Sequence, residues 1–197
     1  MSIPGSQLLA LLVAISFAAG LNVYATVATL GLLAHTKYIE LPQQLHLLSN
    51  WWIIGAAGVL FAVGFVADKI PAFDLVWNAL HTFVRVPVAA LLAWQATSTL
   101  SPGQQLAATL AGGAIAFIAH GGKTAVRTAV TASPEPFSNI GLSLGEDTLS
   151  VSLTWFATAH PYAAAGIAAV LVLVTLLLIR WVWSSLKNLV GTVKQYI

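Results

Sequence analysis

The stretch Ala67-Asp-Lys-Ile-Pro-Ala-Phe-Asp-Leu-Val-Trp-Asn-Ala-Leu-His-Thr-Phe-Val-Arg-Val-Pro87 concentrates polar side chains in a chain that is otherwise apolar. Pro71 suits the first turn of a helix, and it biases the preceding residue, Ile70, away from helical angles. We therefore expect a helix to begin at Pro71. Pro87 removes a backbone hydrogen bond to the carbonyl of Phe83, so we expect a bend there.

Four polar residues of this helix fall on one face. They are spaced at i, i+4, i+7 and i+11, which stacks them along a helix, while apolar residues cover much of the remaining surface. The four are Asp74, Asn78, His81 and Arg85. A polar stripe on an apolar helix indicates a face that must be shielded from lipid.

The composition identifies the class of protein. The chain has 197 residues, of which 58% are hydrophobic and only 7% charged, far from the roughly 25% charged residues of a soluble domain. Runs such as 51–67 and 163–179 carry no charge over about the length that crosses a hydrocarbon core of about 30 Å. The sequence therefore predicts an integral membrane protein. The absence of cysteine excludes disulfide, thiol-redox and cysteine-ligated metal chemistry.

The apolar pattern predicts an all-α, polytopic fold with about six transmembrane segments. We expect a single multi-pass membrane domain over residues 1–183, followed by an amphipathic cytoplasmic tail over 184–197. The first apolar run is too long for a signal peptide and is counted as a span. The expected spans are 7–36, 51–67, 71–100, 106–133, 141–160 and 162–183.

Two of these segments are too long for one upright crossing. The roughly 28 apolar residues within 7–36 would extend about 42 Å as a straight helix, so the segment must tilt steeply or break. Gly20 with Asn22 is the expected break in the first segment, and Gly121-Gly122 is the expected break in 106–133. Weak identities at a shift of one hundred residues suggest a 3+3 inverted repeat relating 7–100 to 106–183.

The positive charge gathers at the carboxyl end. Arg180, Lys187 and Lys194 account for the excess, so the end of the chain is expected in the cytoplasm and the uncharged turn 101–105 outside. Six crossings would then place both termini in the cytoplasm. The expected location of the protein is the plasma membrane of the cell. No basic arm is present, so the sequence gives no reason to expect nucleic acid as a partner.

A second group of charges is expected to meet the polar stripe. His120, Lys123 and Arg127 share one helical face, and Glu146 with Asp147 interrupts the next apolar segment. Arginine side chains suit bidentate binding of phosphate or carboxylate, so we predict a shared cationic site for an anionic group, answered by carboxylates. The predicted binding residues are Asn78, His81, Arg85, Lys123, Arg127, Asp68, Asp74, Glu146 and Asp147.

Each of these residues also has a simpler interpretation. The carboxylates could pair with arginine and lysine only to fix helix packing, Lys123 and Arg127 could snorkel to the interface, and the histidines could make packing hydrogen bonds. The sequence shows no metal-ligand spacing, no nucleophile elbow and no phosphate-binding glycine loop. No catalytic residue, cofactor or resident metal is therefore expected.

Three classes of function remain. The preferred hypothesis is a small transporter, or a lipid- or anion-translocating protein, whose partners are membrane lipids and an anionic small molecule or lipid head group. The first alternative is a non-catalytic membrane partner whose charges only pack. The least favoured is an intramembrane enzyme that uses carboxylates as acid–base groups or cation ligands.

Five blocks of the chain resemble the signature of a bacterial membrane family called domain of unknown function 4126. The blocks are Gly20-Leu-Asn-Val-Tyr-Ala-Thr26, Ala67-Asp-Lys-Ile-Pro71, Trp77 with His81-Thr82 and Arg85, Pro134-x-Pro-x-Ser-Asn139, and Ser143 with Glu146-Asp147. This resemblance implies multi-pass architecture in a bacterial inner membrane, and it names no substrate. The chain departs from it at Gly64, where the family pattern implies an acidic residue, so no role is carried over for that carboxylate.

Overall fold

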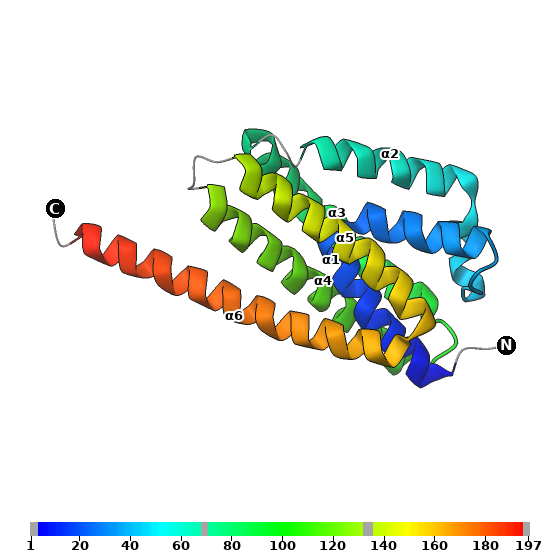
Figure 1. Ribbon diagram of the computed structural model, residues 1–197. Helices are drawn as coiled ribbons and strands as arrows, with labels where there is room; N and C mark the ends of the chain where they lie inside the picture. The colour runs from blue at the N-terminus through cyan, green and yellow to red at the C-terminus, as the bar shows by residue number, and fades with distance from the viewer. Residues whose placement is uncertain (1–3, 68–70, 132–135, 195–197) are drawn as a thin grey trace.

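The computed structural model describes residues 4–67, 71–131 and 136–194, and within these ranges the regular secondary structure is entirely helical. The elements are α1 Gly5–His35, the short 3-10 helix η1 Gln43–Ser49, α2 Trp51–Ala67, α3 Pro71–Ala96, α4 Pro102–Thr131, α5 Pro136–Ala159 and α6 Pro161–Lys194. The α-helices form one bundle (Figure 1). The predicted all-α class is confirmed.

Three of the described helices are long and apolar enough to cross a membrane: Gly5–His35, Val76–Ala96 within α3, and Pro161–Ser185 within α6. A fourth candidate combines η1 with α2, which meet at a bend of 63°. The structure thus supports a membrane protein with three to four candidate spans among the described helices.

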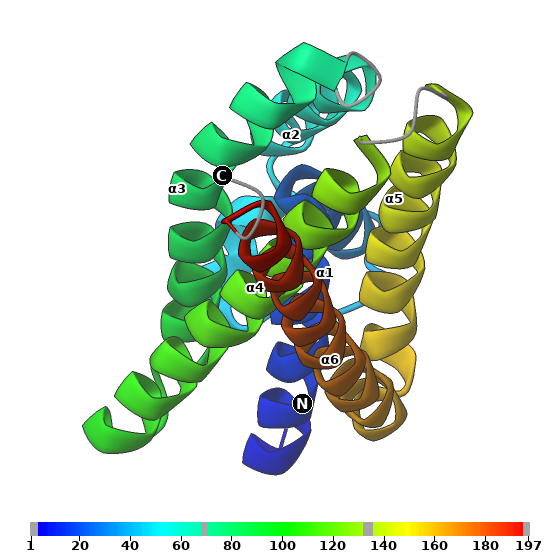
Figure 2. The same cartoon turned by 90° about the vertical axis from the view of Figure 1, so that its left-hand side faces the viewer.

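The core of the bundle is α1, which lies among the other helices (Figure 2). In an apolar window of 18 residues, 72% of the residues are buried in α1, whereas only 11% are buried in α6. A helix that is apolar all round belongs in the interior of a bundle or in lipid. Here α1 takes the interior position and α6 the outer one. Figure 1 shows α6 extending past the bundle, with the two termini at opposite ends of the molecule.

The break that we predicted in the first segment is confirmed at Asn22. Its backbone angles, φ −149° and ψ 99°, are not helical, and they divide α1 into two arms. The Asn22 side-chain oxygen accepts hydrogen bonds from the backbone N–H groups of Tyr24 and Ala25, both at 3.1 Å, and so caps the second arm. After Asn22 the chain turns back toward the end of the molecule that holds the N-terminus (Figure 1).

The predicted break at Gly121-Gly122 is wrong, because α4 is one helix from Pro102 to Thr131. The reason is packing: a Cβ atom at Gly122 would collide with the side chain of Thr175 in α6. The glycine is therefore explained by the close approach of α4 and α6 and not by a change of backbone direction. The two segments paired by the suggested inverted repeat thus differ, one broken and one continuous.

Two other expected features lie within longer helices. Pro87 lies inside α3, which begins at Pro71 as expected and continues to Ala96. The first part of the expected amphipathic tail, 184–197, continues α6 as far as Lys194.

Candidate functional site

The polar stripe of α3 faces the interior. Asn78, His81 and Arg85 are only 4%, 5% and 3% exposed. The Nδ1 atom of His81 lies 2.6 Å from the carbonyl oxygen of Trp77, so Nδ1 carries the proton and donates it. In the neutral ring, Nε2 then accepts from the Tyr24 hydroxyl at 3.0 Å. This contact joins the stripe to the second arm of α1.

Arg85 connects the stripe to α4 through His120. An Arg85 guanidinium N–H donates to Nδ1 of His120 at 3.1 Å. Because arginine can only donate, Nδ1 must be the acceptor, and Nε2 of the neutral ring donates to the Thr82 hydroxyl at 2.7 Å. His120 is 3% exposed. The imidazole is therefore held in one tautomer between two residues of α3.

Lys123 and Arg127 share one carboxylate oxygen. The Lys123 ammonium lies 3.0 Å, and an Arg127 guanidinium nitrogen 2.7 Å, from the same Oε2 atom of Glu146. The side chains are 0%, 4% and 12% exposed, respectively. A buried charge needs a partner of opposite sign. Lys123 and Arg127 are thus paired with a carboxylate in the interior, as both the site hypothesis and the packing interpretation require.

Asp147 points to a different helix from its neighbour Glu146. It is 5% exposed, and its Oδ1 atom accepts a hydrogen bond of 2.7 Å from the side-chain amide of Asn22. Successive residues on an α-helix point about 100° apart. Glu146 therefore binds α4 while Asp147 binds the break in α1, and α5 holds both carboxylates inside the bundle.

Two hydroxyl groups complete the break in α1. The Ser150 hydroxyl lies 3.0 Å from the carbonyl oxygen of Ala18 and 3.1 Å from that of Asn22. The Thr26 hydroxyl donates to the Asn22 carbonyl at 3.0 Å and lies 3.1 Å from the Ser150 hydroxyl. Both side chains are fully buried. Side-chain hydroxyls thus bind carbonyl groups at the point where the helix is interrupted.

Most of the predicted site residues have buried side chains. Their contacts join α3 to α1 and to α4, α4 to α5, and α5 to α1, and we call these contacts together the interior network. Arg85 of α3 donates to His120 of α4, which lies one turn before Lys123, whereas Lys123 and Arg127 bind Glu146 of α5. Asp68 lies outside the described residues, and Asp74 lies in α3 with a side chain that is outside the described part.

Sequence reasoning missed several members of this network as site residues. These are Asn22, Tyr24, Thr26, Thr82 and Ser150. Three of them lie in the Gly20–Thr26 block, which was singled out only for its break and its resemblance. Ser150 follows Asp147 by three positions, a helical spacing that could have marked it.

Among the described residues, hollows open on the sides of the bundle, and three of them bear on the site. One of about 370 Å³ lies between α2 and α5 and is lined by Phe61 and Phe65 together with Asp147. A second, of about 320 Å³, lies among α3, α4 and α6, where His120, Thr82 and Thr124 meet apolar side chains. Apart from these polar residues, both hollows have mainly apolar walls.

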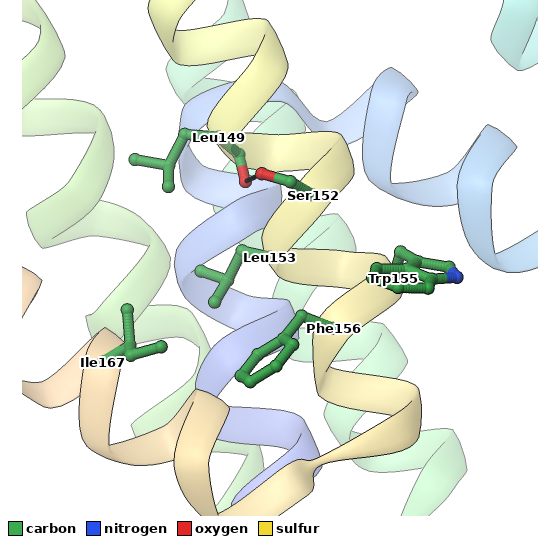
Figure 3. A pocket seen from close by; sticks show the side chains of 6 residues that line it. All are labelled: Leu149, Ser152, Leu153, Trp155, Phe156 and Ile167. Atoms are coloured by element: carbon green, nitrogen blue, oxygen red, sulfur yellow. Dashed lines mark hydrogen bonds between the residues drawn. The ribbon is translucent and has the colours of Figure 1, made fainter.

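The third hollow, of about 290 Å³, is almost wholly apolar. Figure 3 shows Leu149, Leu153 and Phe156 of α5 on the side that faces Ile167 of α6. It offers no charged group to a ligand. Within the described part of the chain, no three histidine or carboxylate side chains are grouped as a transition-metal site would require.

The family-model comparison matches residues 9–181 to the domain of unknown function DUF4126. The match spans most of the chain, so the protein belongs to this family. No curated protein and no solved structure matches the chain.

Proposed function

We propose that this member of the DUF4126 family binds an anionic lipid head group in the interior of the bundle and moves the lipid between the membrane leaflets. The observation that carries the proposal is the shared bond of Lys123 and Arg127 to one oxygen of Glu146. A phosphate has several oxygens, so it can bind both cations at once through different oxygens. Exchange of Glu146 for a phosphate therefore gives a way to bind and release it.

The hollows favour a lipid over a small water-soluble anion. Their walls are mainly apolar, and each includes exposed side chains at the surface of the bundle, such as Phe117 and Trp183 beside His120. In a membrane the opening beside His120 faces acyl chains. An amphiphile can leave its tail in the hollow while its head group reaches the buried network.

We propose that α4 and α5 complete the transmembrane domain and that the carboxyl-terminal end of α6 is cytoplasmic. Arg180 and Lys187 lie at this end, in accord with the excess of basic residues on the cytoplasmic side of membranes. The expectation of two cytoplasmic termini assumed six crossings. The fold instead turns α1 back at Asn22 and separates the termini (Figure 1), which favours an N-terminus on the opposite side.

Cysteine labelling tests this topology in a chain that has no cysteine of its own. Single replacements at Ser2, Gly103 and Gln195 would be exposed to an impermeant thiol reagent on intact cells. We expect Ser2→Cys to be labelled and Gln195→Cys to be protected. Labelling of Gln195→Cys would overturn the orientation, and protection of both would restore the six-crossing arrangement.

Lipid movement is tested in liposomes that carry a fluorescent phosphatidylglycerol in both leaflets. An impermeant reductant bleaches the outer leaflet, and the protein should expose the inner pool as well. Loss of a charge-assisted hydrogen bond of about 1.5–3 kcal/mol predicts that Arg127→Gln and Arg85→Gln slow this movement about tenfold or more. Lys187→Gln is the matched control, because Lys187 is exposed on α6 and lies 5.6 Å from the Trp183 ring.

The alternative is that the buried charges only hold the helices together. In that case the folded protein would leave the inner pool protected, and Arg85→Gln and Arg127→Gln would lower the thermal stability without any effect of anionic lipid. That pair of results would reject the proposed function.

A further inference from the structure

The break in α1 gathers oxygen atoms in the interior of the bundle. The Ser150 hydroxyl lies 3.0 to 3.1 Å from three oxygens: the carbonyls of Ala18 and Asn22 and the hydroxyl of Thr26. Each of these four residues is buried. Each oxygen has lone pairs, so the group is rich in the ligands that hard cations prefer.

A negative charge lies beside these oxygens. Asp147 is bound to the Asn22 amide at 2.7 Å, and it shares one face of α5 with Ser143, Ser150 and Thr154 at positions i, i+4, i+7 and i+11. All four side chains are at most 5% exposed. The Ser143 hydroxyl is fully buried and makes no hydrogen bond to any described residue. It is therefore a further oxygen ligand available on the face that carries Asp147.

A route leads to this carboxylate from outside the bundle. The hollow of about 370 Å³ between α2 and α5 has Asp147 in its wall, next to Leu144, Thr148 and Val151. A small ion can thus reach Asp147 without crossing the Lys123–Glu146–Arg127 cluster, which lies on the α4 side of α5.

We infer that the break in α1 is a Na⁺ site built from Asp147, Ser150, Thr26 and the carbonyl groups of the interrupted helix, with Ser143 as an additional ligand. Interrupted helices bind coupling ions in this way, through unwound carbonyls and nearby carboxylates. The inference rests on the proposed function and deepens it, because it supplies a coupling ion for lipid movement.

Binding requires only small local changes. The oxygens now lie at hydrogen-bond distances, so the hydroxyl protons of Ser150 and Thr26 must turn away and the oxygens must separate slightly to admit the ion. The carboxylate of Asp147 is an anionic ligand, which reduces the cost of placing a cation in the interior. Na⁺ should therefore stabilise the native state over the unfolded chain.

The test compares thermal unfolding of the purified protein in NaCl and in choline chloride at the same ionic strength. We expect a saturable rise of the unfolding temperature with Na⁺ and no such rise with choline. Asp147→Asn keeps the size of the side chain and its bond to Asn22, but it removes the charge, so it should abolish the Na⁺ dependence. Ser150→Ala should raise the Na⁺ concentration that gives the half-maximal effect by about tenfold.

Ser152→Ala is the matched control, because the Ser152 hydroxyl bonds to Thr148 within α5, at 2.6 Å. It should keep the Na⁺ response of the parent protein. Equal stabilisation by choline, or a full Na⁺ response in both Asp147→Asn and Ser150→Ala, would overturn the Na⁺ site.

Lipid movement measured with and without Na⁺ separates this inference from the proposed function. Movement that is independent of Na⁺, together with no Na⁺-dependent stabilisation, would leave the proposed function in place and reject the ion site. Na⁺-dependent stabilisation that is lost in Asp147→Asn, in a protein that moves no lipid, would do the reverse.

Discussion

Helices α1 and α4 contain similar glycine signals, but only α1 is broken. Gly20 precedes the break at Asn22, whereas Gly121-Gly122 lies in an uninterrupted helix. The two helices also cross closely, since a Cβ atom at Gly20 would lie 2.5 Å from the carbonyl oxygen of Ala116 in α4. In both helices, therefore, glycine is required for contact with a neighbour.

The difference lies in what replaces the backbone hydrogen bonds. At the break in α1, Asn22 accepts from two backbone N–H groups and the Ser150 hydroxyl approaches two carbonyls. At Gly121-Gly122, the Thr124 hydroxyl bonds to the carbonyl of His120 in its own helix. An interior helix can be interrupted only where other groups take over its hydrogen bonds. Glycine alone does not break a buried helix.

Among the tests of this comparison, Asn22→Ala should have the largest effect. The change removes the cap of the second arm and the amide that binds Asp147. A lost cap costs about 0.5–2 kcal/mol and a lost hydrogen bond to a charged group about 1.5–3 kcal/mol, so the free energy of unfolding should fall by about 2–5 kcal/mol. Tryptophan fluorescence during denaturant unfolding in micelles measures it.

Asn50→Ala is the control for this prediction. Asn50 caps α2 through a hydrogen bond of 2.8 Å from the Trp52 backbone N–H, but it is exposed. Its loss should cost about 1 kcal/mol. Equal effects of the two substitutions would show that Asn22 acts only as a cap, and that its bond to Asp147 adds nothing.

The sequence predicts where the helices lie better than it predicts whether a helix is broken inside. The expected second span, 51–67, is α2 to the residue, and the break at Asn22 was expected because residues 7–36 overrun a bilayer. The same argument failed for α4, because span length says nothing about the packing of Gly122 on Thr175. That contact joins residues distant in sequence, and only the folded bundle reveals it.

Gly122→Ala tests the packing explanation. The new methyl group would collide with the Thr175 side chain, and overpacking of this kind costs about 1–3 kcal/mol in the free energy of unfolding. Thr175→Ser removes the methyl group in the way, so the double variant should recover most of the loss. The same unfolding measurement reads both.

The neighbouring Gly121→Ala is the control. Its Cβ would lie 3.6 Å from the flexible end of Ile179, which is an ordinary contact, so the stability should be unchanged or slightly raised. If both glycine variants lost stability equally and Thr175→Ser rescued neither, α4 would need its glycines for a bend, and the comparison with α1 would fail.

For the candidate site, the sequence indicated the charged residues but not the neutral residues that bind beside them. The pattern of Lys123, Arg127 and Glu146 indicated pairing, because buried charges need partners. Nothing in the spacing shows that Asn22 and Ser150, 128 positions apart, meet at one point. Neutral hydroxyls and amides are common in helix packing, so their role depends on contacts that only the three-dimensional structure gives.

The smallest expected effect is that of Ser150→Ala. Its hydroxyl lies within hydrogen-bond distance of two carbonyls of α1 at the break, so the substitution removes one hydrogen bond to them and should cost about 0.5–1.5 kcal/mol. In α4, Thr124→Val removes a hydroxyl whose acceptor, the His120 carbonyl, belongs to an uninterrupted helix. That carbonyl keeps its backbone partner, so the change should stay within about 0.5 kcal/mol.

Denaturant unfolding in micelles without Na⁺ separates the two values from any effect of ion binding. A larger loss for Thr124→Val than for Ser150→Ala would mean that the carbonyls at the break do not depend on Ser150, and the account of why α1 alone can be interrupted would have to be abandoned.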